Sequence, residues 1–400
     1  MLMFDCIVVG GGASGVFAAI QAKDADPSSR ILLVEKGPKL LSKVLCTGGG
    51  RCNVTNACFE AFDLISHYPR GAKELLGPFH RFGPREMMSY LESRKVSLKV
   101  EAGQRVFPTS DQSETIVDLL EKELHRKKVE VRCEVDIEKI THENGTYRLE
   151  NTALETPSLI IATGGNSAGY KWAEELGHTI ITPVPSLFAL KLKNNPLKAL
   201  SGVCCESVQV RIGDFAQEGS LLITHFGLTG PAVLKLSSQA ARRLHEQKYQ
   251  ADIEINWLPL LKEDQIFEKL ILMKQAAPKK LFATQNPFSF SKSLWAIFSE
   301  NKRWGELSQK KLREVAKKLC HDRYAVNGRS VHKEEFVTCG GVCLKEVDFK
   351  TMESKICPNL YFAGEILDID GFTGGFNLQN AWTTGYLAGR ASVSSLLRIG

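Results

Sequence analysis

Residues 4–20 read Phe-Asp-Cys-Ile-Val-Val-Gly-Gly-Gly-Ala-Ser-Gly-Val-Phe-Ala-Ala-Ile, an apolar stretch that runs into glycines and then into a second apolar stretch. Gly10, Gly12 and Gly15 have the G-x-G-x-x-G spacing of a strand-to-helix turn that binds a dinucleotide. The first glycine allows the tight turn, the second lets a pyrophosphate approach the backbone, and the third lets the helix pack closely. Backbone N–H groups and the positive end of the helix then hold the phosphates.

The next residues complete a βαβ unit around this turn. We predict strands at 4–9 and 30–35, with a helix at 16–23 between them. Glu35 ends the second strand, twenty residues after Gly15, and its carboxylate is placed to accept hydrogen bonds from the adenosine ribose. The sequence therefore predicts a dinucleotide with free ribose hydroxyls, the alternative being a chance glycine turn.

The other end of the chain favours FAD over NAD. Leu360-Tyr-Phe-Ala-Gly-Glu365 is a short apolar strand, and after an acidic loop Gly374 and Gly375 open a helix that runs to about Gly389. Such a helix start suits the ribityl chain and the flavin ring, because its positive end stabilises negative charge on reduced flavin. A plain strand-to-helix turn is the alternative, but a fold that binds only NAD has no need for this second element.

Between these ends, the first half of the chain continues the nucleotide fold. Helical periodicity marks 85–95 and 113–128, and 129–135 alternates as a third parallel strand. Residues 137–150, with Asn144-Gly145 at the centre, predict a hairpin. Leu159 to Gly165 predicts a buried strand that reaches the ligand edge of the sheet.

The middle of the chain has a different pattern. It alternates as β-structure from 188 to about 255, with a hairpin at Gly213-Asp214 and a helix at 231–245. Basic helices then precede further strands at 321–340. We therefore predict three parts: an FAD-binding domain (1–188 and 334–400), a β-rich substrate lobe (189–258 and 321–333) and a helical cap (259–320).

Composition is that of a soluble enzyme. The formal charge of +6, from 51 basic and 45 acidic residues, suits anionic ligands without requiring nucleic acid. The chain starts without a signal peptide and has no apolar run of about 20 residues, so we expect a cytoplasmic protein with no membrane span. Eleven cysteines without a C-x-x-C pair predict reduced thiols and no metal site. No feature points to a particular oligomeric state.

Five segments together resemble the bacterial flavoprotein family that includes aminoacetone oxidases and bile-acid dehydro-intermediate reductases. They are Gly10 to Gly15, Thr47-Gly-Gly-Gly-Arg-Cys-Asn-Val-Thr-Asn56, Ala162-Thr-Gly-Gly165, Thr224-His-Phe-Gly-Leu-Thr-Gly-Pro231 and Phe362-Ala-Gly-Glu-Ile-Leu-Asp-Ile-Asp-Gly-Phe-Thr-Gly-Gly-Phe-Asn-Leu-Gln379. The resemblance covers essentially the whole chain and is loose at 255–320. It implies an α/β fold: a two-piece, Rossmann-like FAD-binding domain of the glutathione-reductase type with an inserted β-barrel-like lobe and a small helical lobe. It leaves the substrate open, because the known activities of the family differ.

The resemblance also implies which residues bind FAD. The pyrophosphate and adenosine end would be held by Gly10, Gly12, Ala13, Ser14, Gly15, Glu35, Lys36, Lys43 and the backbone of Val135. The ribityl and flavin end would be lined by Gly49, Gly50, Arg51, Asn53, Thr55, Gly364, Glu365, Asp370, Gly375, Phe376, Asn377 and Leu378. Ala162, Thr163 and Gly164 would also bind the cofactor. Thr47 stands where the family usually has serine.

Two residues are candidates for catalysis. Arg51 would stabilise anionic reduced flavin or clamp an anionic substrate, unless it only braces its loop. His225, at a strand end, would donate a proton near the flavin, unless it is a packed loop histidine. Cys52 is better explained as a buried thiol than as a redox residue, because no resolving cysteine is paired with it.

The prediction is an FAD-dependent oxidoreductase that moves hydride or electrons between a small organic substrate and flavin. No second G-x-G-x-x-G follows Ala162-Thr-Gly-Gly165, so NADH, NADPH or O2 would act as a transient partner at the open flavin. An alternative is RNA modification through the basic helical cap, which carries Lys274, Lys279, Lys280, Lys302, Arg303, Lys310, Lys311, Arg313, Lys317 and Lys318. Nucleic acid is not favoured, because no stacking aromatics or RNA-binding motif accompany these charges. A flavin-bearing sensor without turnover is the third possibility.

Overall fold

The computed structural model describes residues 2–330 and 337–394. The chain divides into two compact units, one formed by 1–185 with 333–400 and the other by 186–332. The predicted boundary between the β-rich lobe and the second piece of the FAD-binding domain, at 333/334, lies outside the described residues. The three-part division into domains stays a prediction.

A seven-stranded sheet forms the core of the first unit, in the order β20-β21-β22-β11-β2-β3-β7. Strands β22 (Leu360–Phe362), β11 (Leu159–Ile161), β2 (Cys6–Val9), β3 (Ile31–Val34) and β7 (Glu130–Arg132) run parallel, and β20 (Val347–Asp348) and β21 (Glu353–Ser354) are antiparallel. Every residue of β2 and β3 is buried, as expected for parallel strands covered on both faces. The sheet therefore joins β2, near the start of the chain, to β22, near its end.

Helices and three smaller sheets surround this core. The helices are α1 (Ala13–Ala25), α2 (Ser42–Gly50), α3 (Ala61–Ile65), α4 (Ala72–Arg81), α5 (Pro84–Glu92), α6 (Glu114–Arg126), α7 (Ser167–Glu175) and α13 (Phe376–Ser394). The sheets are β1-β10-β9-β8 (Leu2–Met3, Leu154–Thr156, Thr146–Leu149, Ile140–Glu143), β4-β6-β5 (Thr55–Asn56, Arg105–Pro108, Leu98–Glu101) and β12-β19 (Ile180–Ser186, Val337–Val342).

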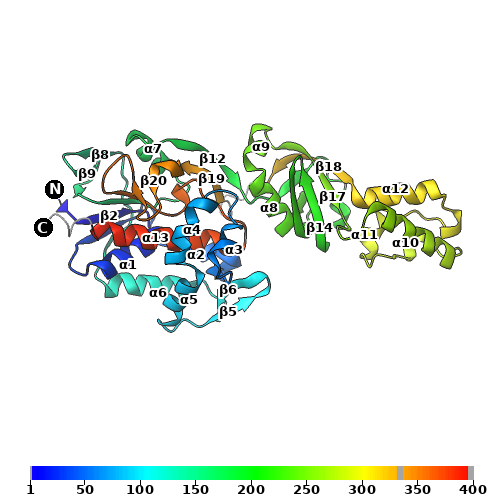
Figure 1. Cartoon of the computed structure of the whole chain (residues 1–400), viewed down its shortest axis with the longest axis horizontal. Helices are drawn as coiled ribbons and strands as arrows, with labels where there is room; N and C mark the ends of the chain where they lie inside the picture. The colour runs from blue at the N-terminus through cyan, green and yellow to red at the C-terminus, as the bar shows by residue number, and fades with distance from the viewer. Residues whose placement is uncertain (1, 331–336, 395–400) are drawn as a thin grey trace. The chain divides into compact units, whose positions relative to one another are not determined.

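Helices α1 and α13, from opposite ends of the chain, lie side by side in this unit (Figure 1). Two glycines of α13 make this possible, because a Cβ at Gly385 would stand 2.5 Å from the Ser14 carbonyl oxygen and one at Gly389 would stand 2.1 Å from that of Ala18. Glycines four residues apart share one helix face. The first turn of α1 is thus fixed against α13 by direct backbone contact.

The second unit is built on a closed barrel of six strands. Their order is β13-β16-β15-β14-β17-β18, with bounds Leu190–Leu192, Gly227–Thr229, Phe215–Ile223, Cys204–Ile212, Gln250–Asn256 and Asp322–Arg329. Helices α8 (Pro231–Gln239) and α9 (Ala241–Glu246) follow β16. Buried side chains such as Val208, Val210, Leu221 and Ile253 alternate with more exposed ones along the strands.

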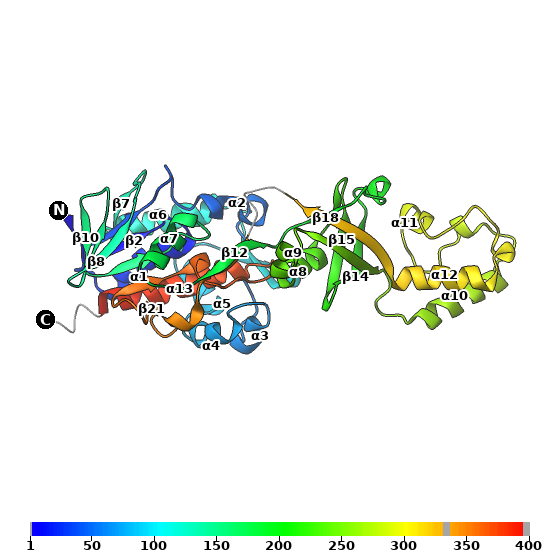
Figure 2. The same cartoon turned by 90° about the horizontal axis from the view of Figure 1, so that it is seen from above.

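A helical lobe is inserted between β17 and β18 of this barrel. Helices α10 (Glu263–Ala276) and α12 (Gln309–Cys320) pack against each other, and α11 (Lys292–Ala296) lies between them in sequence (Figure 2). Buried Phe282, Trp295 and Trp304 form its aromatic core, with ring centroids of the first two 5.1 Å apart. The predicted fold class, an α/β nucleotide fold with an inserted barrel and a helical lobe, is confirmed.

Locally encoded elements lie where the sequence predicts them. The hairpin at Asn144-Gly145 joins β8 to β9, and both turn residues have positive φ, 52° and 75°, as a two-residue hairpin turn requires. Residues Ser42–Cys46, just before the glycine-rich segment, are helical, and the chain leaves helical geometry from Thr47. Within the described ranges, no helix combines the length and apolarity needed to cross a membrane.

Candidate functional site

The turn at Gly10 to Gly15 has the geometry of a phosphate-binding turn. Gly10 follows β2 with φ 112°, and a Cβ at Gly15 would stand 1.9 Å from the Gly10 carbonyl oxygen. At Gly12, the N-cap of α1, a Cβ would meet no atom within 4 Å, and no side chain caps the helix. The first turn of α1 therefore faces open space with its N–H groups, as an anion-binding helix start does.

Glu35 lies at the carboxyl end of β3, beside this turn. Its carboxylate accepts hydrogen bonds from the N–H groups of Gly11 at 2.6 Å and Gly37 at 2.7 Å. The Val135 N–H donates to the Glu35 carbonyl at 3.0 Å, so the two residues predicted at the adenosine end are neighbours. Lys36 forms an exposed ion pair with Asp136 at 2.8 Å.

Three consecutive glycines follow the helical part of α2. Gly48, Gly49 and Gly50 all have left-handed backbone, with φ of 60°, 69° and 81°, which L-residues with a Cβ rarely adopt. A Cβ at Gly49 or Gly50 would meet no atom within 4 Å. The peptide backbone is therefore exposed at this turn, as it is where a ligand must approach closely.

Arg51 is held by partners from the β5–β6 region. Its guanidinium donates to the carboxylates of Glu101 at 2.9 Å and Asp111 at 3.3 Å, and it stacks over the Phe107 ring at 4.1 Å. These contacts correspond to the loop-bracing alternative for Arg51. A direct role at the flavin stays a prediction.

The segment after Arg51 contacts the start of α13. In the amide orientation that satisfies its neighbours, Asn53 accepts from the Gly375 N–H at 3.0 Å and donates to the carbonyls of Val106 and Thr55. The Thr55 hydroxyl donates to Gln379 Oε1 at 2.6 Å. A Cβ at Gly375 would stand 2.4 Å from the Thr55 carbonyl oxygen, so the segment after the glycine turn lies directly against the start of α13.

Two side chains at the start of α13 also have protein partners. The Asn377 amide donates to the Gly371 carbonyl and accepts from the Gly371 N–H, each at 2.8 Å, and so closes the loop before the helix. The buried ring of Phe376 stacks on His67, with centroids 4.2 Å apart. Leu378 is half-buried in the same turn. Contacts of these residues with a cofactor stay predictions.

A buried ion pair ties this loop to a segment that the motifs did not indicate. Asp370 has a fully buried side chain and forms a bidentate ion pair with Arg70, whose side chain is 16% exposed. Residues 70 and 370 also form an isolated antiparallel bridge. The polar and turn-forming stretch His67-Tyr-Pro-Arg-Gly71 is a signal in the sequence, but nothing in its spacing pairs it with Asp370.

The loops at the carboxyl ends of β11 and β22 meet around Glu365. Its carboxylate accepts from Lys43 Nζ at 3.1 Å and from the Thr338 N–H at 2.8 Å. A Cβ built at Gly164 would lie 3.5 Å from the same carboxylate. A Cβ at Gly364 would stand 2.4 Å from Ser14 Oγ. The structure thus brings the predicted residues of the N-terminal and C-terminal motifs together.

Ala162 and Thr163 connect β11 to this edge. The Ala162 N–H donates to the Val9 carbonyl at 2.8 Å. The Thr163 hydroxyl is buried against Gly169 of α7 and has no hydrogen-bond partner among the described residues.

Cys52 and His225 are the two remaining candidates from the sequence. Burial raises the pKa of the Cys52 thiol to about 12, so it is a neutral thiol near pH 7 and a poor nucleophile. His225 lies in the second unit, exposed at the turn between β15 and β16, with its carbonyl accepting from Asn195 at 2.9 Å. Its role as a proton donor stays a prediction.

These residues fit FAD. The open, uncapped start of α1 suits a pyrophosphate, the Glu35 and Val135 pair lies beside it for the adenosine, and the exposed backbone of Gly49 and Gly50 allows a flat ring to approach. Among the described residues no group of three or more His, Cys, Asp and Glu side chains is arranged to hold a metal.

The chain is similar to known proteins over nearly its whole length. Over residues 4–391 the chain matches the model of the family described as HI0933-like protein Rossmann domain. It is 31% identical to the 3-dehydro-bile acid delta(4,6)-reductase of Clostridium scindens, over 96% of this chain and 98% of that protein. It is 29% identical to the ribosomal RNA dihydrouridine synthase of Haemophilus influenzae, over 95% of this chain and 96% of that protein.

A solved structure shares the fold at low identity. The 3-ketosteroid delta1-dehydrogenase of Sterolibacterium denitrificans has a TM-score of 0.52 and 12% identity, with 99% of this chain and 100% of that chain covered. The fold is thus the Rossmann-type FAD-binding fold that the two glycine motifs predict. The chain belongs to the HI0933-like Rossmann domain family and is a flavoprotein oxidoreductase.

Proposed function

We propose that this protein is an FAD-dependent reductase that adds hydrogen across a carbon–carbon double bond conjugated with a carbonyl group. Both named relatives support this reaction: one reduces delta(4,6) bonds of a 3-dehydro-bile acid, and the other forms dihydrouridine from uridine in ribosomal RNA. The substrates differ greatly in size, but in each the double bond is electron-poor and accepts a hydride. The shared chemistry is therefore a better guide to the reaction of this protein than either substrate is.

The observation that carries the proposal is that one unit contains three backbone elements suited to FAD: the open start of α1, the left-handed turn Gly48–Gly50 and the start of α13. Helices α1 and α13 pack together, and Asn53 and Thr55, just after the turn, lie against Gly375. In this proposal the first turn of α1 holds the pyrophosphate and Glu35 holds the adenosine ribose. When bound, FAD supplies hydride transfer at its isoalloxazine ring.

The remaining residues position the flavin end. The positive end of α13 stabilises negative charge at the edge of the ring. Asn53, Thr55 and Asn377 fix that helix start through the hydrogen bonds described above, and the Arg70–Asp370 ion pair fixes the loop before it. Gly49 and Gly50 leave the backbone open to the ring or to the substrate.

NADH or NADPH is the proposed electron donor, binding transiently because the sequence contains a single dinucleotide turn of the G-x-G-x-x-G type. Anaerobic stopped-flow mixing of the purified yellow protein with each nucleotide tests this directly. We expect rapid bleaching of the flavin absorbance by one of them. Mixing the reduced protein with a conjugated dienone of the steroid type should then restore the absorbance, as one carbon–carbon double bond per reduced flavin gains a hydride and a proton, and give the product with one double bond fewer.

A second candidate keeps the reaction and changes the substrate to a uridine in RNA. Two observations favour it: the dihydrouridine synthase relative and the strong positive charge of the helical lobe. An unmodified ribosomal RNA transcript, mixed with the reduced protein, should then restore the flavin absorbance and gain dihydrouridine. A protein that binds no FAD, or a flavin that neither nucleotide reduces and no conjugated double bond reoxidises, would contradict the proposal.

A further inference from the structure

The positive charge of the chain is concentrated in the helical lobe. Residues 259–320 contain 13 lysine and arginine residues and 6 acidic residues, an excess of seven, whereas the whole chain carries +6. The rest of the chain is therefore close to neutral. Charge gathered on one small lobe creates a local field that a distributed surface charge does not.

Many cations of the lobe already have protein partners. Lys274 and Lys318 donate to the carbonyls of Leu307 and Ile297, and Arg313 pairs with Asp264 at 3.1 Å. Lys311 pairs with Glu300 at 2.6 Å, and Lys302 pairs with the same carboxylate at 3.1 Å. These residues serve mainly to hold the lobe together.

Backbone pairing places three further cations next to Lys302 on the surface. Leu281 and Arg303 form an antiparallel bridge, the Phe282 N–H donates to the Lys302 carbonyl at 2.8 Å, and the Trp304 N–H donates to the Lys280 carbonyl at 3.0 Å. These pairings place Lys279 and Lys280 next to Lys302 and Arg303, and all four side chains are exposed. We call these four residues the basic patch.

Three of the four charges of the basic patch are available to a partner, while Lys302 is paired with Glu300. Within the described ranges, no hydrogen bond or ion pair involves the side chain of Lys279, Lys280 or Arg303. Beneath the patch, the rings of Phe282 and Trp304 pack edge to face with centroids 4.6 Å apart, and both side chains are fully buried. The cations thus stand on a rigid base, so their ordering on binding is less unfavourable than in a flexible tail.

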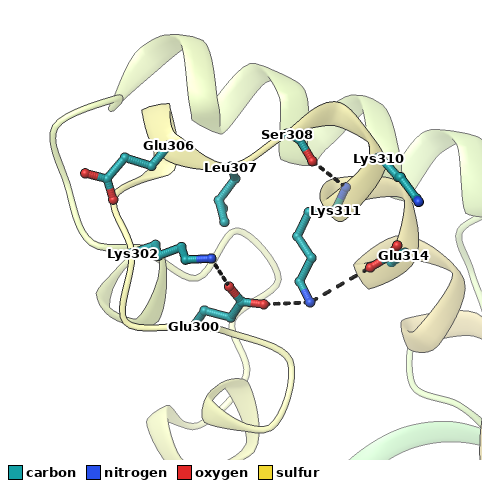
Figure 3. Close-up of a pocket in the computed structure, with 8 residues that line it drawn as sticks. All are labelled: Glu300, Lys302, Glu306, Leu307, Ser308, Lys310, Lys311 and Glu314. Carbon is teal, nitrogen blue, oxygen red and sulfur yellow. Dashed lines mark hydrogen bonds and ion pairs between the residues drawn. The ribbon is translucent and has the colours of Figure 1, made fainter.

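A shallow depression beside the patch is lined by the acidic groups of this surface, and each of them has a partner within the lobe (Figure 3). Glu300 lies between Lys302 and Lys311, and Lys311 also faces Glu314 at 3.9 Å. The Glu306 carboxylate accepts from the Arg303 N–H at 3.0 Å. Lys310 is exposed, and among the described residues its side chain forms no ion pair, which extends the available positive surface beyond the patch.

We propose that the basic patch binds the phosphate backbone of an RNA substrate. The inference rests on the second candidate function above, and it assigns substrate docking to the helical lobe, apart from the reaction at the flavin. Lysine and arginine contacts with phosphates supply most of the sequence-independent affinity of such proteins. An anionic membrane fits less well, because Leu281 is the only large apolar side chain among the described residues 278–282 and 302–305 that is exposed, and stable attachment needs a larger apolar face.

Binding of a fluorescein-labelled hairpin RNA with uridines in its loop tests the proposal, measured by anisotropy over a series of salt concentrations. The test variant is Lys279→Gln/Lys280→Gln/Arg303→Gln in the FAD-loaded protein. The matched control is Lys73→Gln/Lys122→Gln/Lys128→Gln, which removes the same charge from exposed lysines of the other unit. We expect the patch variant to bind RNA about tenfold more weakly or worse, with a salt slope lower by about two, and the control to bind like the original protein.

Bound FAD and its reduction by NADH or NADPH are measured in the same samples and should be unchanged in both variants. Equal weakening by both variants, or no RNA binding by the original protein, overturns the proposal. The proposal is also overturned if the original protein binds phosphatidylglycerol vesicles and the patch variant loses this binding but still binds RNA. Since anisotropy needs no turnover, a failure of flavin reduction counts against the proposed function alone, and a failure of RNA binding counts against the docking surface alone.

Discussion

At the scale of single residues, Gly12 and Gly15 belong to the same turn but have different tasks. A Cβ at Gly12 meets no protein atom within 4 Å, whereas one at Gly15 would stand 1.9 Å from the Gly10 carbonyl oxygen. Gly12 leaves room for a ligand, and Gly15 leaves room for the chain itself. The two tasks separate experimentally because one affects binding and the other affects folding.

Gly12→Val should abolish FAD binding and leave the apoprotein nearly as stable as before. The valine side chain fills the space of the pyrophosphate, while its effect at a helix N-cap is about 1 kcal/mol. Absorbance of the purified protein and its thermal unfolding measure the two effects. Gly15→Val, the control, should unfold the apoprotein. Retention of flavin by Gly12→Val would show that the turn is not the phosphate site.

A second residue-scale prediction concerns Arg51. If it braces the glycine turn through Glu101, then Arg51→Met and Glu101→Gln should each weaken FAD binding. The double variant should then bind FAD no more weakly than the weaker-binding of the two single variants. If Arg51 instead touches the flavin, Glu101→Gln should bind FAD normally. Arg105→Met is the matched control, because Arg105 lies 3.8 Å from Glu101 but outside the glycine turn. Equilibrium dialysis of FAD against these four variants and the original protein distinguishes a bracing role of Arg51 from direct contact with the flavin.

At the scale of elements, a carboxylate joins α5 to α6. Glu123 on α6 accepts from Arg126 at 2.8 Å and from Arg94, just after α5, at 3.0 Å. Hydrogen bonds from Arg126 lower the pKa of the buried Glu123 carboxyl to about 2, against the opposing effect of its burial. A carboxyl whose pKa is lowered in the folded state stabilises the fold once it is ionised.

Glu123→Gln should therefore lower the free energy of unfolding at pH 7 by about 2 to 3 kcal/mol. The contribution of Glu123 is complete above its unfolded pKa of about 4.5 and is lost as the pH falls toward 2, so the two proteins should converge in that range. Urea unfolding at several pH values measures the difference. Glu121→Gln on the exposed face of α6 is the control, and a gap that stays constant down to pH 2 would contradict the assignment.

At the scale of the whole molecule, both chain ends lie in the same unit and the barrel lies in the other. A ligand that binds only the folded first unit stabilises that unit by about 2.7 kcal/mol when its concentration is 100 times the Kd. The second unit gains nothing directly from the same contacts.

Addition of FAD to apoprotein should thus slow hydrogen exchange in α1 and α13 and leave β14 and β15 of the barrel unchanged. Mass spectrometry of exchanged peptides reads the two units separately in one experiment. The Gly12→Val protein should show no slowing anywhere. Equal protection of both units by FAD would mean that the barrel also holds the cofactor.

The sequence alone determined the elements whose signals are local. The glycine turn after β2, the hairpin at Asn144-Gly145 and the buried strands β11 and β22 follow from backbone sterics and from hydrophobic pattern within a few residues. The pairing of the two FAD motifs was also predictable, because strands of a doubly wound fold share one ligand edge.

Which side chains meet follows from the tertiary fold and not from local sequence. The ion pair of Arg70 with Asp370, the partners of Arg51 and the backbone contact of Gly389 with Ala18 join residues far apart in the chain. The sheet β4-β6-β5 likewise depends on pairing between distant segments. Local propensity carries no information on such contacts, since each is selected by packing of the whole unit rather than by the residues beside it.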